Sequence, residues 1–144
     1  MRPPIVPFVA VLVAGLGACA TTPVIEMPIS AERVIGKWSL TRVGGQSVSR
    51  AMTMDFGRDG LMLGTSRCNS MSGSYEVRPP TVVFPSPVII TTAGCGGDYP
   101  PNERAVELAE RILFADPTSG WSISSDGQRL VVHGEEELRF ARQR

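Results

Sequence analysis

Three cysteines and one histidine are the residues of this chain with the most distinctive chemistry. Cys19 ends the sequence Leu16-Gly17-Ala18-Cys19, which follows an apolar run beginning at Ile5. This run has the length of a signal-peptide core and is shorter than the ~20 residues that a membrane-spanning helix needs. Leucine three residues before a cysteine, with small residues between them, is the pattern of a bacterial lipobox. We therefore expect cleavage before Cys19 and lipidation of its thiol.

Lipidation at Cys19 would hold the mature protein on a membrane without crossing it, because several acyl chains give stable anchoring. Ala20 lacks the acidic character that commonly retains such lipoproteins at an inner membrane. We therefore expect a lipid-anchored protein of the cell envelope, at the outer membrane and facing the periplasm. An ordinary secretory signal with a chance cysteine after Ala18 is the alternative interpretation.

Cys68 and Cys95 remain as a pair once Cys19 carries lipid. Exported domains meet an oxidising environment, so this pair is expected to form a disulfide. In the chain-entropy model a loop of this size would contribute roughly 3–4 kcal/mol. Two buried, reduced thiols are the alternative.

The chemistry of an enzyme or a metal site is not indicated. His133 is the only histidine, and Cys68 and Cys95 are too far apart for a Cys-x-x-Cys metal pair. A Cys–His nucleophile would need a free thiol of low pKa, which a disulfide removes. Asp98 and Glu103 could be imagined as a pair of catalytic carboxylates, but solvation of a loop residue and capping at a helix start explain them better. We predict a protein that is not an enzyme and has no metal site and no cofactor.

The charge balance argues against nucleic acid as a partner. The chain has 14 basic and 14 acidic residues, whereas nucleic-acid-binding domains carry a basic stripe. We expect residues 1–18 to be a signal peptide, residues 19–33 the lipidated cysteine and a tether, and residues 34–144 one folded domain.

Short strands separated by tight turns are predicted for most of this domain. Lys37–Val43 is predicted to be a half-buried strand, in which Trp38, Leu40 and Arg42 would share one face. Lys37, Ser39 and Thr41 would lie on the other face. Asp59-Gly60 indicates a type I′ hairpin turn, with positive φ at both central residues. The whole pattern predicts seven to nine strands, and those beyond Lys37–Val43 are expected at residues 52–56, 61–65, 72–77, 81–84, 88–92, 121–124, 129–133 and 137–141.

One helix is expected late in the chain. Asn102 is a natural N-cap, Glu107 can pair with Arg111, and the helix should end near Phe114. The apolar stripe of this helix is formed by Ala105, Leu108, Ala109 and Ile112. The fold class is therefore α+β, mainly antiparallel β, with a rolled sheet or small partly open barrel and one helix packed against it.

Two local features bear on binding. If the barrel is incompletely filled, an apolar hollow for a small or lipid-like ligand would be lined by Trp38, Met52, Met54, Met62 and Phe84. Core packing is the alternative for these side chains. Asn69 is expected to have a structural role in a turn, where its side chain can bond backbone groups.

The most specific motif in the chain is Cys68-Asn69 with Ser72-Gly73-Ser74-Tyr75 and the downstream Cys95. The other motifs, in chain order, are Gly36-Lys37-Trp38-Ser39-Leu40, Val43-Gly44-Gly45, Met54-Asp55-Phe56, Asp59-Gly60, Thr92, Glu103 and Leu138-Arg139-Phe140. This succession resembles the META domain (HslJ-like) family from Val34 to Ala141. Arg67 departs from the resemblance, because the family usually has glycine before the first of these cysteines.

The resemblance implies an antiparallel β domain with a helix, often on exported lipoproteins, and an association with stress or envelope integrity. It implies no established reaction. We therefore expect a non-catalytic interaction module that helps an envelope assembly or stress response and binds an envelope protein partner. A carrier or sensor of a small apolar ligand in the barrel interior is the second hypothesis.

Overall fold

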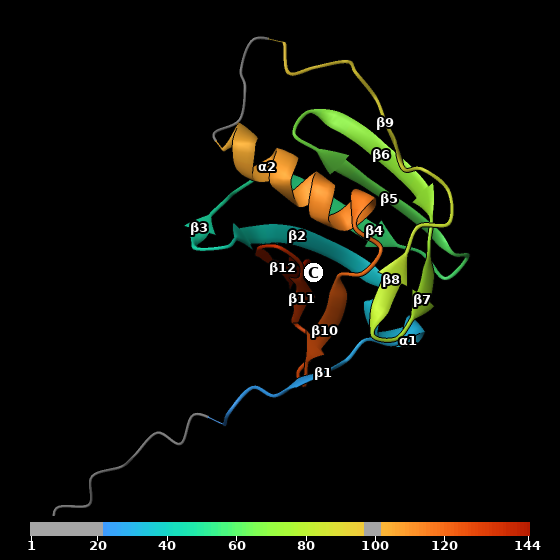
Figure 1. Ribbon diagram of the computed structural model, residues 1–144, viewed down its shortest axis with the longest axis vertical. Helices are drawn as coiled ribbons and strands as arrows, with labels where there is room; N and C mark the ends of the chain where they lie inside the picture. Colours follow the sequence, from blue (N-terminus) through green and yellow to red (C-terminus); the bar gives the residue numbers. More distant parts are fainter. Residues whose placement is uncertain (1–21, 97–101) are drawn as a thin grey trace, which may run out of the picture.

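A computed structural model describes residues 22–96 and 102–144, which form a curved antiparallel sheet with a helix packed against it (Figure 1). The expected signal peptide and Cys19 lie outside the described residues. The strands are β1 Glu26–Pro28, β2 Gly36–Val43, β3 Gln46–Ser47, β4 Met52–Phe56, β5 Leu61–Ser66, β6 Asn69–Ser74, β7 Glu76–Arg78, β8 Thr81–Val83, β9 Ile89–Ile90, β10 Gly120–Ser124, β11 Arg129–His133 and β12 Glu137–Arg142. The helical segments are α1 Ala31–Val34, α2 Glu103–Glu110 and the π-helical η1 Arg111–Ala115.

The strands of the main sheet follow the order β1-β10-β11-β12-β2-β4-β5-β6-β9, with β3 beside β2, and β7 and β8 form a separate hairpin. The expected mainly antiparallel α+β fold is confirmed. The outer strands β1 and β9 do not pair with each other, so the sheet is not closed into a barrel. More strands occur in the described residues than the expected seven to nine, because pairs as short as β3 and β9 leave little pattern in the sequence.

A β-bulge changes which residues of β2 face the core. Trp38 and Leu40 are buried, as predicted. The prediction that Arg42 shares a face with Trp38 and Leu40 is wrong. The pairing of β2 with β12 shifts beside Phe140, so Val43 is buried and Arg42 is partly exposed. An extra residue in one strand reverses the faces of those that follow it.

The turn between β4 and β5 also differs from its expected type. Gly60 has a φ of 79°, whereas Asp59 is not left-handed. The amide of Gly57 donates to the carbonyl of Leu61 at 2.8 Å, so three residues form the loop. Three-residue loops of this kind place one left-handed residue at the end, which glycine adopts without steric cost. The predicted type I′ geometry is therefore wrong, although the hairpin is present.

The folded part of the chain begins earlier than the expected tether boundary. β1 pairs with β10 through Glu26 and Ser124. Ile29 and Val34 are buried, and the side chain of Ser30 caps the short helix α1. Any tether can therefore include only residues before about Glu26, because β1 pairs with the sheet and Ile29 and Val34 contribute side chains to the core.

The helix packs on β2 through a face that is rotated from the predicted stripe (Figure 1). The buried residues of α2 and η1 are Ala105, Val106, Ala109, Ile112 and Leu113. Leu108 is only half-buried at the edge of the contact. Because Val106 and Leu113 lie on the same side of the Ala105–Ala109 line, they draw the face away from Leu108.

Asn102 occupies the predicted N-cap position but does not cap with its side chain. Its φ is 80°, and its carbonyl accepts from the amides of Ala105 and Val106. The Asn102 side chain instead accepts a 2.5 Å hydrogen bond from Gln46. The start of α2 is thus tied to β3.

Trp38 lies at the centre of a core that joins both ends of the folded chain. Its indole nitrogen donates to the carbonyl of Val34 at 2.8 Å, and the Arg142 guanidinium lies 4.2 Å from the ring centroid. Arg142 also donates to the carbonyls of Ile35 and Arg33, each at 2.8 Å. Burial, and to a smaller extent the nearby Arg33, lowers the pKa of Arg142.

We predict that Ile112→Ala destabilises the protein far more than Leu108→Ala. Ile112 is 1 % exposed, and truncating a buried isoleucine to alanine typically costs about 2–5 kcal/mol. Leu108 already contacts water, so its truncation leaves a smaller cavity. Urea denaturation of both variants measures the difference, and equal losses would show that the helix is docked by the originally predicted stripe.

Candidate functional site

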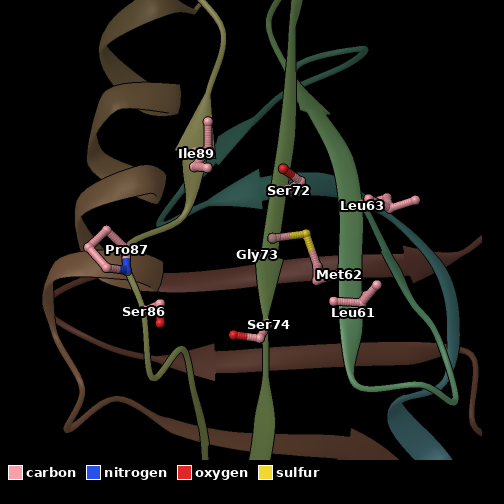
Figure 2. Close-up of a pocket in the computed structure, with 9 residues that line it drawn as sticks. All are labelled: Leu61, Met62, Leu63, Ser72, Gly73, Ser74, Ser86, Pro87 and Ile89. Atoms are coloured by element: carbon pink, nitrogen blue, oxygen red, sulfur yellow. The ribbon is translucent and has the colours of Figure 1, made fainter.

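An open groove runs along β6 on the outer face of the sheet, opposite the core (Figure 2). Its volume is about 400 Å³. Ser72, Gly73 and Ser74 form its floor, and Figure 2 shows Leu61 and Leu63 on one side of β6. Pro87 and Ile89 lie on the other side. Met62 and Ser86 complete the lining.

Strand alternation explains why apolar side chains reach this outer face. Met62 points into the core and is fully buried, so its neighbours Leu61 and Leu63 point outward. The register places Leu63 beside Ser72, and Ser72 beside Ile89. Leu61, Leu63 and Ile89 are 48 %, 58 % and 69 % exposed, which makes them prominent apolar side chains in contact with water.

Gly73 allows the second wall to approach β6. A Cβ atom at this position would lie 3.1 Å from Cγ2 of Val88, closer than most real contacts of that kind. The absence of a side chain therefore lets Val88 pack on the strand and brings Pro87 and Ile89 beside it. The groove depends on small residues in its floor.

Two smaller hollows continue this surface and share Leu63 with the groove. One, of about 320 Å³, extends past Ser70 to Thr91. The other, of about 150 Å³, is lined by Asp55, Gly57, Asp59, Leu61 and Leu63. We call the three together the β5–β6 surface. It is apolar and hydroxyl-bearing on the β6 side of Leu61 and Leu63, and the carboxylates of Asp55 and Asp59 lie on the β4 side.

The acidic side of the β5–β6 surface includes the β4–β5 turn, which carries Asp59. Asp59 accepts a hydrogen bond from the amide of Leu61 at 3.1 Å. Tyr75 donates from its hydroxyl to the carbonyl of Gly57 at 2.6 Å. Burial, and next the charge of Asp59, raise the pKa of Tyr75, so this phenol stays neutral near neutral pH.

The residues predicted to line an interior hollow lie mainly in the packed core. Trp38, Met52, Met54 and Met62 are at most 1 % exposed and belong to one hydrophobic cluster. Phe84 is partly buried against this cluster and packs edge-to-face on Phe114, with ring centroids 5.1 Å apart. Met62 also lines the groove along β6, whereas Trp38, Met52, Met54 and Phe84 do not. The five residues therefore do not line one pocket together there.

Cys68 and Cys95 form the predicted disulfide, with their Cα atoms 5.0 Å apart. The bond joins the β5–β6 hairpin to the segment that follows β9. Beside it, the Asn69 side chain accepts a hydrogen bond from the amide of Gly94 at 3.0 Å. Asn69 therefore makes a local backbone contact of the kind predicted for it. Of the two carboxylates considered in the sequence analysis, Asp98 lies outside the described residues and Glu103 begins α2.

Arg67 connects the same hairpin to the helix. Its φ of 53° is in the left-handed region, which explains why glycine is the usual residue at this place in the resembling family. The guanidinium lies 3.6 Å from Glu103 and 3.5 Å from Glu107. The predicted Glu107–Arg111 pair is wrong, because Arg111 instead pairs with Glu135 at 2.7 Å.

A polar cluster on the outer face of β1, β10, β11 and β12 was missed by the sequence analysis. His133 Nε2 lies 2.9 Å from Ser122 Oγ and 3.6 Å from Glu26, and His133 Nδ1 lies 3.9 Å from Glu137. Glu26 lies in the expected tether. The sequence could therefore have indicated only that Ser122 and His133 lie on the same face of one hairpin. Its ion-pairing side chains are 39–46 % exposed, so the cluster ties β1 to the sheet in contact with water.

Within residues 22–96 and 102–144, no helix is both long and apolar enough to span a membrane. These ranges also contain no group of three or more His, Cys, Asp or Glu residues placed to hold a metal ion.

Comparison with known proteins identifies a family and a related fold. The profile described as META domain matches residues 32–144. No curated protein matches the chain. An NMR structure of a protein from Burkholderia xenovorans is similar, with a TM-score of 0.54 and 16 % identity, over 99 % of this chain and 98 % of that one. At this identity the similarity establishes the fold alone.

We predict that Arg67→Gly leaves the protein more stable than Arg67→Ala. Both changes remove the ion pairs with the helix, but alanine keeps the left-handed strain, which costs roughly 1–2 kcal/mol for a residue with a Cβ atom. Urea denaturation of the two variants gives the difference directly. An alanine variant as stable as the glycine variant would show that the turn changes conformation when the ion pairs are lost.

Proposed function

We propose, from the premise that this chain belongs to the META domain family, that it is a lipid-anchored envelope protein and a non-catalytic interaction module. In this proposal the β5–β6 surface contacts an envelope protein partner. Anchoring occurs through Cys19, at the outer membrane and facing the periplasm, and the interaction serves envelope integrity or a stress response.

The observation that carries the proposal is the exposed apolar groove on an otherwise hydroxyl-rich sheet face. Contiguous apolar surface that remains in contact with water is typical of interaction sites. The nine residues that line the groove are apolar, glycine or serine, so the lining offers shape and apolar contact rather than a general base beside a nucleophile. A binding role uses these properties directly.

The Cys68–Cys95 disulfide supports an exported location. Disulfides persist in oxidising compartments, and cytosolic proteins rarely keep them. The chain leaves the domain at β1, so an anchor at Cys19 would be separated from Glu26 by only a short segment. Such a segment spans at most about 25 Å at 3.3–3.6 Å per residue. The domain would therefore act close to the membrane surface.

A carrier of a small apolar ligand is the second candidate function, favoured by the volume of the groove. About 400 Å³ falls within the range of small-molecule sites. However, the groove is an open surface channel, and the residues expected around an interior ligand pack tightly in the core. This arrangement supports the interaction module over the carrier.

Cys19→Ser is expected to abolish membrane anchoring. The variant removes the thiol that would receive the lipid, so labelled palmitate should enter the original protein and not the variant. Membrane fractionation in a bacterial host should move the variant to the soluble or unprocessed fraction. Equal labelling of both proteins would exclude lipidation at this residue.

Photo-crosslinking in cells tests the interaction role. A photoreactive residue at Leu63 or Ile89 of the full-length chain is expected to capture the same discrete protein, because both positions line the groove. The same probe at Glu136, an exposed residue in the β11–β12 turn, serves as the control and should not capture it. Adding Leu61→Ser should weaken the crosslink. Capture from all three positions alike, or from none, would contradict the proposal.

A further inference from the structure

We propose that the β5–β6 surface binds an extended polypeptide segment in which apolar side chains alternate and a basic residue follows them. This inference rests on the proposed function and specifies its partner. The apolar side chains would occupy the groove between Leu63 and Ile89. The basic residue would reach across β5 to Asp55 and Asp59, which lie on the β4 side of the Leu61–Leu63 wall.

The spacing of the groove wall fits an extended segment. Leu61 and Leu63 are two residues apart on β5 and point to the same face. Side chains two residues apart on an extended chain are separated by about 6.6 Å, at 3.3 Å per residue. A peptide running along β6 would therefore place every second side chain against this wall. The small floor residues leave room for those side chains.

The charges of the β5–β6 surface favour a basic residue next to the apolar residues of the bound segment. Among the residues that line its three hollows, the charged ones are Asp55 and Asp59. Lys37 is opposite Asp55 in the register of β2 and β4, but it does not line any of the three hollows. The lining therefore offers two carboxylates and no cation to an occupant.

The edge of the sheet is less suited to the partner than its face. β9 is the last strand and has only two residues, Ile89–Ile90. Pro85 and Pro87 precede it and have no amide hydrogen to donate. Prolines beside an edge strand prevent further strand pairing. Binding would therefore use side-chain contacts in the groove.

A membrane surface is a poorer occupant than a peptide. Surfaces that dock on bilayers combine a protruding apolar face with Lys or Arg residues that attract anionic lipid. The β5–β6 surface is hollowed, and its charged lining residues are acidic. Asp55 and Asp59 would repel anionic lipid headgroups from this surface.

A pair of matched peptides tests the inference. The probes are acetyl-Leu-Ser-Leu-Ser-Lys-amide and the same peptide with Glu in place of Lys. Each is titrated into the full-length chain, purified in mild detergent with methyl-labelled Leu and Ile, and followed by NMR. The Lys peptide should shift the methyl signals of Leu61, Leu63 and Ile89. It should bind about two- to fivefold more tightly than the Glu peptide, the ratio expected for an exposed ion pair.

Matched variants separate the two parts of the inference. Leu63→Ser should weaken both peptides by about tenfold or more, whereas Val24→Ser, at an exposed apolar residue on the N-terminal segment, should leave both unchanged. Asp55→Asn should remove most of the preference for Lys, and Glu32→Gln on α1 should not. Dispersed spectra confirm that each variant is folded.

Several outcomes would overturn the inference. Binding of neither peptide at millimolar concentration would exclude a peptide groove, and equal binding of both would exclude the basic neighbour. Shifts of the same methyl signals by phosphatidylethanolamine–phosphatidylglycerol vesicles, without any by the peptides, would assign the surface to lipid instead. A discrete cellular crosslink from Leu63 with no peptide binding would leave the interaction role standing and refute only this partner chemistry.

Discussion

The burial of Trp38 is the constraint on which the ends of the folded chain depend. A fully buried indole needs a hydrogen-bond acceptor for its N–H, and the carbonyl of Val34 provides it. Arg142 covers the ring and binds carbonyls of the segment between α1 and β2. One side chain thus requires α1, β2 and the end of β12 to assemble together. This is why residues ahead of β2 are folded although their sequence has no clear periodicity.

Burying only one face of an open sheet determines which of its residues stay in contact with water. The helix covers β2 on the inner face through small residues such as Ala105 and Ala109, which allow close approach. The chain provides no second helix in the described residues for the outer face of β5 and β6. Apolar residues on that face therefore remain in contact with water. The β5–β6 surface follows from this one-sided packing, together with the small floor residues of β6.

Local patterns were sufficient to predict much of the fold. Alternation in β2 placed Trp38 and Leu40 on one face, which is the buried one, and the isolated cysteine pair indicated the disulfide. The bulge beside Phe140 and the phase of the helix were not predictable, because each depends on packing between distant segments. The candidate site had a signal that was overlooked. Leu61, Met62 and Leu63 are consecutive apolar residues, which makes both faces of β5 apolar.

Contacts at the turn of the β5–β6 hairpin hold the two strands in place. These strands form much of the groove. The Cys68–Cys95 disulfide joins the turn to the segment after β9, Arg67 links it to the helix, and Ser66 donates a hydrogen bond to Glu110. These contacts hold the floor strand β6 and bring the chain that carries Ile89 back toward it. A groove held in this way loses little conformational entropy when an occupant binds. The left-handed strain at Arg67 is therefore compatible with a binding role, because the ion pairs it permits connect the groove strands to the core helix.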